Sequence, residues 1–205
     1  MTFIAVEGIE GSGKSTLIAG LAEGLRRDGY AVVMTREPGG TRVGNAMREV
    51  FLNNANAMAP LTESLLVNAA RAQHVFEVIR PALALERIVL CDRFIDSTLA
   101  YQGYGRGLRL DTLRELCSIA TGGLQPDLVL LLDVPVNVAR GRLRERTASD
   151  RIEAEGDDFH ERVRRGFLEL AGEPGHRVLD GTLPPGTLLE QAMEEVRAGL
   201  GTRVP

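Results

Sequence analysis

The feature that most restricts the fold of this chain is the segment Gly8–Ser15, which reads Gly-Ile-Glu-Gly-Ser-Gly-Lys-Ser. It lies directly after a short apolar run, Thr2–Val6, and directly before a pattern of helical period. That pattern is formed by Leu17, Ile18, Leu21 and Leu25. Glycines let the backbone curl so that successive N–H groups point at an anion, and the helix N-terminus adds its positive dipole end. The segment therefore predicts a strand, a phosphate-binding loop and a helix in succession.

Within this loop the lysine and the serine have different tasks. Lys14 is a flexible point charge that can reach the β- and γ-phosphates of a nucleotide, and the Ser15 hydroxyl can hold Mg²⁺. Lys14 is also the one lysine among the 24 basic residues of the chain. The alternative interpretation is an ordinary glycine-rich turn before a helix. The position between a strand and a helix favours phosphate binding.

Short apolar runs alternate with helical patterns along the rest of the chain. The further predicted strands are Ala31–Thr35, Ile88–Asp92, Leu128–Asp133 and His176–Asp180. The further helical patterns are Leu61, Leu65, Ala69 and Phe76; Phe159, Val163, Phe167 and Leu170; and Leu189, Met193, Val196 and Leu200. Near-continuous apolar strands separated by helices are typical of a parallel sheet covered on both faces. We predict an α/β fold with a doubly wound, five-stranded parallel sheet flanked by helices, in a single domain over residues 1–205.

Composition excludes several classes of protein. Of the 205 residues, 44% are hydrophobic and 25% are charged, which is ordinary globular usage. No apolar run approaches the roughly 18 residues of a membrane span, and no secretory signal is visible. The formal charge of −4 argues against a general surface for nucleic acid. Cys91 and Cys117 belong to no paired motif, which indicates reduced core thiols. We expect a cytoplasmic protein with neither a membrane nor a nucleic-acid polymer among its partners.

An acid–arginine pair, Asp92 and Arg93, stands at the end of the predicted strand Ile88–Asp92. Ligands of open α/β sheets bind outside the carboxyl ends of the strands. There Asp92 could hold Mg²⁺ through water, and the forked guanidinium of Arg93 could bind a second phosphate. In isolation such a pair is more often a plain salt bridge, but the nearby phosphate loop favours the functional interpretation.

Four arginines, Arg140, Arg142, Arg144 and Arg146, stand directly before the polar segment Thr147–Asp158. Phosphoryl transfer needs cations on the transferring group besides the loop lysine, and the phosphate loop itself contains no arginine. We expect about residues 140–157 to form a mobile lid that supplies one. On a helix Arg142 and Arg146 share one face, while Arg140 and Arg144 share another. The alternatives are a solvated helix face followed by a plain solvated connection.

With these residues in view, the chain resembles the bacterial thymidylate kinases of the P-loop nucleoside monophosphate kinase superfamily, nearly end to end. The matching blocks are Glu7–Thr16, Thr35–Thr41, Ala69–Arg71, Asp92–Arg93, Ala100–Gly103, Gly105–Gly107, Pro126–Asp127, Leu132–Asp133 and Asp150–Glu153. The phosphate loop marks only the superfamily. The block Arg-Glu-Pro-Gly-Gly-Thr together with Ala-Tyr-Gln-Gly is far more specific.

The resemblance implies a role for the residues around the acceptor phosphate. Arg93 matches an arginine that contacts this phosphate, and Asp92 matches the acid that serves the magnesium. Arg36 and Arg71 match arginines that line the monophosphate and base side, with Arg71 placed to bond the thymine edge. The Glu37–Pro38 bond resembles the cis-proline site of the family.

The resemblance also implies how the nucleoside is held. Tyr101 and Gln102 match positions that close on the deoxyribose and base, and Tyr101 would disfavour a 2′-hydroxyl by crowding. Glu10 matches an acid that approaches the sugar. One departure is Val67, which stands where the family usually has an aromatic residue that stacks on thymine. Such stacking contributes about 0.5–1.5 kcal/mol beyond burial, so Phe94 or Tyr101 would have to compensate.

The family divides by where its catalytic arginine lies, and this chain resembles the type in which the lid supplies it. Arg146 is the best match, with Arg142 and Arg151 as its neighbours. The expected catalytic residues are Lys14, Asp92, Arg93 and Arg146, and the expected metal ligands are Ser15 and Asp92. The expected ATP-binding residues are Gly8, Ile9, Glu10, Gly11, Ser12, Gly13, Lys14, Ser15, Thr16 and Arg142. The expected substrate-binding residues are Glu10, Arg36, Pro38, Val67, Arg71, Arg93, Ser97, Thr98, Tyr101 and Gln102.

The reaction that the resemblance implies is transfer of the γ-phosphate of ATP to dTMP, with Mg²⁺, by a homodimer whose candidate interface is the helix Leu61–Ile79. The same apolar stripe could instead be ordinary core. One rival is a kinase for another nucleoside monophosphate. Another is a nucleotide-binding module without turnover. A GTPase switch is excluded because its Asn-Lys-x-Asp motif requires a second lysine besides Lys14.

Overall fold

The strands form one parallel sheet in the computed structural model, which describes residues 2–143 and 150–201. The strand order is β2-β3-β1-β4-β5, and every neighbouring pair is parallel. The strands are β1 (Thr2–Glu7), β2 (Val32–Arg36), β3 (Ile88–Asp92), β4 (Leu128–Asp133) and β5 (His176–Asp180). Each strand lies within one residue of its predicted bounds. Since the sheet is five-stranded and parallel, as predicted, the fold class is confirmed.

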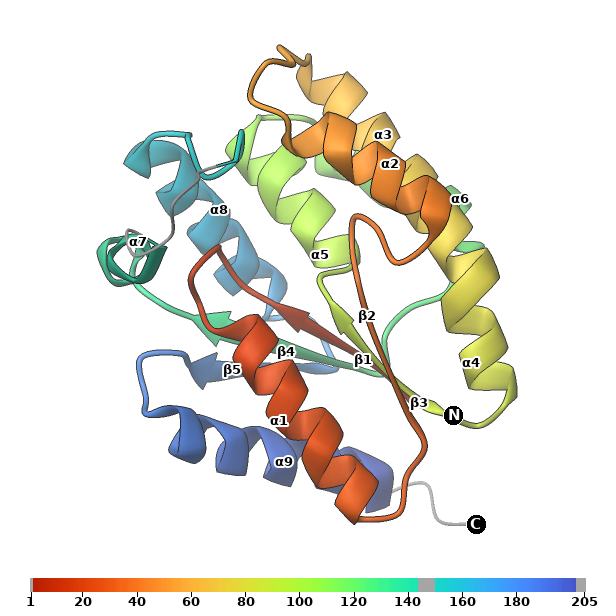
Figure 1. The fold of residues 1–205 in the computed structure, drawn as a ribbon. Helices are drawn as coiled ribbons and strands as arrows, with labels where there is room; N and C mark the ends of the chain where they lie inside the picture. Colours follow the sequence, from red (N-terminus) through yellow and green to blue (C-terminus); the bar gives the residue numbers. More distant parts are fainter. Residues whose placement is uncertain (1, 144–149, 202–205) are drawn as a thin grey trace.

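Helices cover both faces of this sheet (Figure 1). One face carries α1 (Lys14–Arg27) and α9 (Pro185–Gly201). The elements that pack on the other core are α2 (Arg42–Leu52), α3 (Pro60–His74), η1 (Val75–Ile79), α4 (Arg80–Ala84), α5 (Ile95–Thr98), η2 (Leu99–Gly105), α6 (Leu110–Thr121), α7 (Val136–Leu143) and α8 (Asp157–Leu170). Of these, η1 and η2 are π-helical, a form found mostly as single turns and frequently at functional sites.

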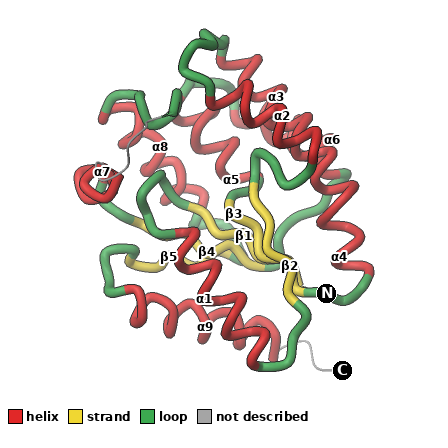
Figure 2. The backbone as a smooth tube through the Cα atoms, viewed as in Figure 1, coloured by secondary structure: helices red, strands yellow, loops and turns green. Residues whose placement is uncertain are grey.

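The period of a strand divides the interior into two apolar cores. Along β1, Phe3 and Ala5 enter the core beneath α2 to α8, whereas Ile4 and Val6 enter the core beneath α1 and α9. All four side chains are almost fully buried, because the central strand is covered on both faces. The loops that follow the strands gather at one edge of this sheet (Figure 2).

The helical pattern in the sixties and seventies is present as the continuous run α3, η1 and α4, but its apolar stripe is not core. Leu61 and Leu65 are half exposed, and Phe76 is 74% exposed. The buried face of α3 is largely polar and consists of Glu63, Ser64, Val67, Asn68, Ala70, Arg71 and His74. This reversal has a local cause: the inner face of α3 forms part of the wall of a cavity.

The arginine-rich region is only partly described. Its first residues belong to α7, and residues 150–156 form turns before α8. Arg144 and Arg146 lie outside the described residues, so the predicted lid and its catalytic arginine stay predictions. Within the described residues, no helix combines the length and apolar composition needed to cross a membrane.

Candidate active site

The phosphate loop joins β1 to α1. Gly13 is the N-cap of α1 and has a φ of 102°, a left-handed conformation that glycine adopts readily. The Lys14 ammonium is folded into the loop and donates to the carbonyl oxygens of Gly8 (3.0 Å) and Ile9 (2.9 Å) and to Ser12 Oγ (3.4 Å). Burial and the Arg93 charge lower the pKa of Lys14 to about 8. These carbonyls hold the ammonium where an anion in the loop would meet it.

The predicted ATP side of the loop is closed by α7. A Cβ atom at Gly11 would lie 2.4 Å from the carbonyl oxygen of Ala139, so only glycine allows this approach. Arg142 donates to the carbonyl oxygens of Gly11 (3.3 Å) and Gly181 (3.0 Å), which places its guanidinium against the loop. Arg140 turns the other way and forms an ion pair with Asp157. The two arginines lie on different faces of α7, as the helical spacing predicts.

Ser15 and Asp92 are brought together by the register of β1 and β3, in which Val6 lies opposite Asp92. The Ser15 hydroxyl donates to Asp92 Oδ2 over 3.2 Å. One hydroxyl and one carboxylate are hard oxygen donors, and Mg²⁺ takes one or two carboxylates and fills its remaining positions with water and phosphate oxygens. The predicted metal ligands are therefore adjacent and chemically suited to Mg²⁺.

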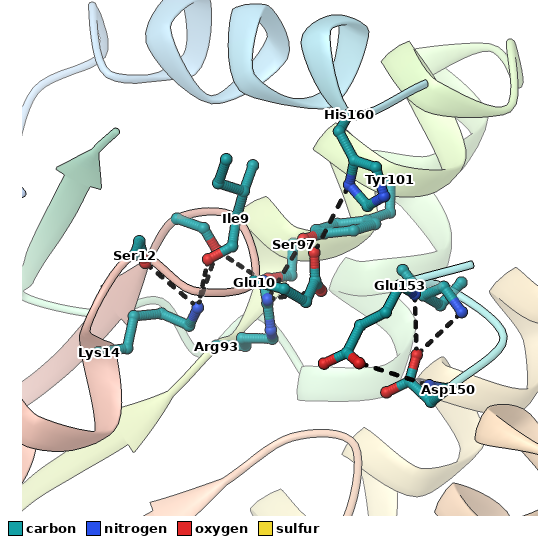
Figure 3. A network of polar contacts seen from close by, with 12 residues as sticks. Ile9, Glu10, Ser12, Lys14, Arg93, Ser97, Tyr101, Asp150, Glu153 and His160 are labelled. Carbon is teal, nitrogen blue, oxygen red and sulfur yellow. Dashed lines mark hydrogen bonds and ion pairs between the residues drawn. The ribbon is translucent and has the colours of Figure 1, made fainter. Parts of the chain in front are cut away.

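Arg93 lies at the centre of a polar network (Figure 3). Its Nη1 donates to the Gly8 carbonyl (2.9 Å) and Ser97 Oγ (3.0 Å), and its Nη2 donates to Glu10 Oε1 (2.8 Å) and Tyr101 OH (3.2 Å). Burial alone would lower the pKa of Arg93, but its anionic surroundings outweigh burial and raise the pKa. This arginine stays cationic and points where the loop and η2 meet.

Two acidic residues anchor this network from the β1 side. Glu7 is buried, and its Oε1 accepts from the backbone N–H of Phe94 (2.7 Å) while its Oε2 accepts from Ser97 Oγ (2.6 Å). Glu10 Oε2 accepts from Tyr101 OH over 2.7 Å and lies 3.8 Å from His160 Nδ1. Glu7 therefore fixes the start of α5, and Glu10 holds the hydroxyl of Tyr101.

A cavity of about 400 Å³ extends from the phosphate loop toward α2 and α3. Every predicted substrate-binding residue lines it, and so do Lys14, Ser15 and Asp92. Those substrate residues are Glu10, Arg36, Pro38, Val67, Arg71, Arg93, Ser97, Thr98, Tyr101 and Gln102. The Glu37–Pro38 peptide is cis, as the resemblance implied. Residues spread from the first loop to η2 thus meet at one cavity that is large enough for a small ligand.

Sequence reasoning missed several lining residues. Arg48, from α2, lies in the electrostatic field of Arg36 and Arg93 and donates to the Pro38 carbonyl over 3.0 Å. Phe51 supplies an aromatic lining residue from α2, although Val67 stands at the family's aromatic position in α3. No local signal distinguished these two, because Arg48 and Phe51 look like ordinary residues of an amphipathic helix.

At the far end of the cavity Arg71 is buried and tightly held. Its Nε donates to Glu37 Oε2 (2.7 Å), its Nη1 to Asn68 Oδ1 (3.1 Å) and Cys117 Sγ (3.3 Å), and its Nη2 to the Phe94 carbonyl (2.8 Å). Burial alone would lower the pKa of Arg71, but the Glu37 carboxylate outweighs it and raises the pKa. Arg71 is thus a fixed cation at the cavity wall.

Glu63 is a buried acidic residue on the same inner face of α3 as Arg71. It is 1% exposed and accepts from Gln102 Nε2 (3.2 Å) and Arg106 Nε (3.2 Å), and it pairs with Arg151 Nη1 (2.5 Å). Arg151 also donates to the carbonyl oxygen of Phe51 over 2.9 Å. Of the arginines considered for catalysis, Arg151 is therefore engaged in docking residues 150–156 on α2 and α3.

Together these features define a class of protein. A parallel sheet with a phosphate loop after its central strand, opening on a cavity lined by arginines, is the architecture of a P-loop kinase for a small phosphorylated acceptor. The family model described as Thymidylate kinase matches residues 6–191. The chain belongs to the thymidylate kinase family, and its activity is that of a dTMP kinase, a phosphotransferase.

Individual relatives agree with this assignment. Thymidylate kinase of Desulforudis audaxviator is 55% identical over 180 residues, which cover 86% of this chain and 81% of that protein. Thymidylate kinase of Desulfovibrio desulfuricans is 48% identical, with 98% of this chain and 97% of that protein covered. The crystal structure of thymidylate kinase from Ehrlichia chaffeensis is similar with a TM-score of 0.77 at 33% identity, covering 95% of this chain and 98% of that one.

Proposed function

We propose that the cavity binds dTMP while the phosphate loop binds the ATP phosphates, so that the γ-phosphate passes from one to the other. The observation that carries this proposal is that the predicted acceptor residues and the loop lysine share one cavity. Catalysis then comes from positioning and charge neutralisation, with no covalent intermediate. Lys14, on the loop side, neutralises charge on the transferring phosphate.

The acceptor phosphate is held by arginines at the middle of the cavity. Arg36 ends β2, Arg48 lies in α2 and Arg93 follows β3, and all three line it. Forked guanidinium groups bind phosphate oxygens with two hydrogen bonds, which fixes direction as well as charge. Arg93 has Glu10 as its present partner, and a substrate phosphate would take over part of that interaction.

Base recognition is proposed for Arg71 and Gln102. The amide nitrogen of Gln102 donates to Glu63, which leaves its oxygen to accept from a ligand. Arg71 offers a donor on the same wall. A donor beside an acceptor complements the 4-carbonyl and N3–H of thymine, whereas cytosine carries an amino group and a bare ring nitrogen there. This pair favours thymine over cytosine.

Mg²⁺ would be held by Ser15 and Asp92, and when bound it would neutralise phosphate charge.

Arg146, outside the described residues, is proposed as the lid arginine from the sequence alone. Replacing Arg146 by Ala should lower kcat about a hundredfold or more. Arg151→Ala should instead act on dTMP binding and stability, because Arg151 is paired with Glu63. Equal losses of kcat in the two variants would contradict this division.

The experiment that tests the proposal is an acceptor screen. A coupled spectrophotometric assay with ATP and Mg²⁺ would compare dTMP, dUMP, dCMP, UMP and dGMP. The highest kcat/KM should belong to dTMP. A better acceptor among the others would overturn the substrate assignment, and ATP binding without turnover of any acceptor would indicate a silent nucleotide-binding module.

We further propose a homodimer in the cytoplasm. Large apolar side chains stand exposed on elements that lie on one side of the sheet (Figure 1). This outer face consists of Val43, Val50, Leu61, Leu65, Phe76 and Ile119 on α2, α3, η1 and α6. Exposed apolar patches of this kind mark interaction sites. Cys91 and Cys117 are free and buried, in keeping with a reducing compartment.

A further inference from the structure

A chain of buried polar contacts runs behind the base end of the cavity. Thr35 Oγ1 lies 2.5 Å from His74 Nε2, His74 Nδ1 lies 2.9 Å from Glu37 Oε1, and Glu37 Oε2 accepts from Arg71 Nε over 2.7 Å. His74 is completely buried, and it does not line the cavity. The His74 ring therefore does not contact a ligand in the cavity, and it can influence that ligand only by positioning Glu37 and, through Glu37, Arg71.

The direction of these hydrogen bonds follows from the chemistry of the groups. An ionised carboxylate can only accept, so the N–H on Nδ1 of His74 donates to Glu37. In the neutral ring Nε2 is then an acceptor, and the Thr35 hydroxyl donates to it. The ring is also clamped by the backbone, because a Cβ atom at Gly40 would lie 2.6 Å from His74 Cδ2. His74 thus holds one oxygen of Glu37 in a fixed place.

The guanidinium of Arg71 has five N–H donors, and protein groups take four of them. Glu37 takes the donor on Nε, Asn68 and Cys117 take those on Nη1, and the Phe94 carbonyl takes one on Nη2. Within the described residues, the second N–H on Nη2 has no acceptor. It is the one donor that Arg71 can offer to a molecule in the cavity.

We propose that His74 is a positioning residue for base selectivity, which keeps Glu37 on a single nitrogen of Arg71 so that one Nη2 donor stays available to the base. The inference rests on the proposed binding of dTMP in this cavity. Without His74, the Glu37 Oε1 atom would be a buried acceptor lacking a partner. The carboxylate would then turn both oxygens to the fork of Arg71 formed by Nε and Nη2, because bidentate pairing is the stronger arrangement. The donor that meets a 4-carbonyl would be lost.

The test compares kcat/KM for dTMP with kcat/KM for dCMP in His74→Leu, His74→Asn and Thr35→Val. This ratio does not depend on the fraction of active protein, so a merely structural defect leaves it unchanged. His74→Leu should lower the ratio about tenfold, as expected for the loss of one base-reading hydrogen bond. His74→Asn keeps a donor near Nδ1 and should retain the ratio within about threefold. Thr35→Val removes the hydroxyl that bonds to His74 Nε2 and should lower the dTMP-to-dCMP ratio about threefold. If His74→Leu does not fold, this second variant tests the proposal.

A double-mutant cycle shows whether the effect passes through Arg71. In an Arg71→Gln background, His74→Leu should lower the ratio no further. An additional tenfold loss there would overturn the proposal, and so would wild-type ratios in both His74→Leu and Thr35→Val. A wild-type enzyme without preference for dTMP would instead overturn the proposed function. The two failures are therefore distinguishable.

Discussion

Lys14 in the phosphate loop and Glu7 directly before the loop are both buried, and burial shifts both pKa values toward neutrality. The pKa of Lys14 is lowered to about 8, chiefly by burial and then by the Arg93 charge. The pKa of Glu7 is raised to about 7, chiefly by burial and then by Asp96. At the residue scale, the ionisable groups at the phosphate loop are thus already desolvated in the ligand-free protein.

Lys14 offers a direct test of the phosphate site because the chain has no other lysine. An amine-directed reagent, applied at about pH 8.5 where this ammonium is largely deprotonated, should modify Lys14 and the amino terminus. ATP with Mg²⁺ should protect Lys14, and peptide mass spectrometry would measure both sites. The amino terminus is the internal control. Unchanged labelling of Lys14 under saturating ATP would contradict the assignment of the loop.

Glu7→Gln should change how stability depends on pH. Because the folded pKa of Glu7 lies above its ordinary value of 4.5, ionising Glu7 costs folding free energy as pH rises from about 4.5 to about 7. The variant carries no such cost, so its free energy of unfolding relative to wild type should rise by up to about 3 kcal/mol between pH 5 and pH 8. Urea unfolding at both pH values measures this difference. A pH-independent difference would mean that the carboxyl does not titrate in this range.

At the scale of elements, the helix α8 packs so closely on η2 that glycine is required at the contact. A Cβ atom at Gly166 would lie 2.6 Å from Tyr104 Cγ and 2.8 Å from its Cβ, atoms that cannot move without the backbone. Gly105 faces Phe159 at a similar distance of 2.7 Å. Because η2 carries Tyr101 and Gln102, this close contact also sets the position of one wall of the cavity.

Gly166→Ala should therefore destabilise the fold by about 1–3 kcal/mol, as overpacking does. Gly186→Ala is the matched control, because no atom of the described residues lies within 4 Å of a Cβ atom built at this position of α9. Alanine is the better helix former, so the control should be neutral or stabilising by up to about 1 kcal/mol. Chemical denaturation of both variants makes the comparison. Equal stabilities would show that α8 can shift away from η2 at little cost.

For the whole molecule, the outer face on α2, α3, η1 and α6 leads to a prediction about assembly. Analytical ultracentrifugation should find a dimer, and Phe76→Asp should weaken it about a hundredfold or more, because burying an unpaired charge in an apolar interface is costly. Leu168→Asp is the control, since Leu168 is exposed on α8, a helix that contributes no residue to this face. Dissociation of both variants alike, or of neither, would contradict the proposed interface.

The sequence by itself determined the five strands, the helical patterns of α1, α3, α8 and α9, and the chemistry at the ends of the strands. Strand bounds came within one residue because buried parallel strands are continuous apolar runs, and the loop Gly8–Ser15 specifies its own conformation. The placement of Asp92 next to Ser15 followed as well, because parallel strands end at the same edge of a sheet. The base-side residues, such as Arg71 and Gln102, came from the resemblance to a family and not from periodicity.

Only the tertiary structure decided which way α3 faces and which charges meet. Periodicity gives the spacing of an apolar stripe but not its partner, so Leu61 and Phe76 could not be assigned to core or surface. The buried pairs of Glu63 with Arg151 and of Glu37 with Arg71 join residues 88 and 34 positions apart. Such pairs form only after packing has removed water and left each buried charge in need of compensating partners. The local sequence around each residue therefore does not predict which buried charges pair.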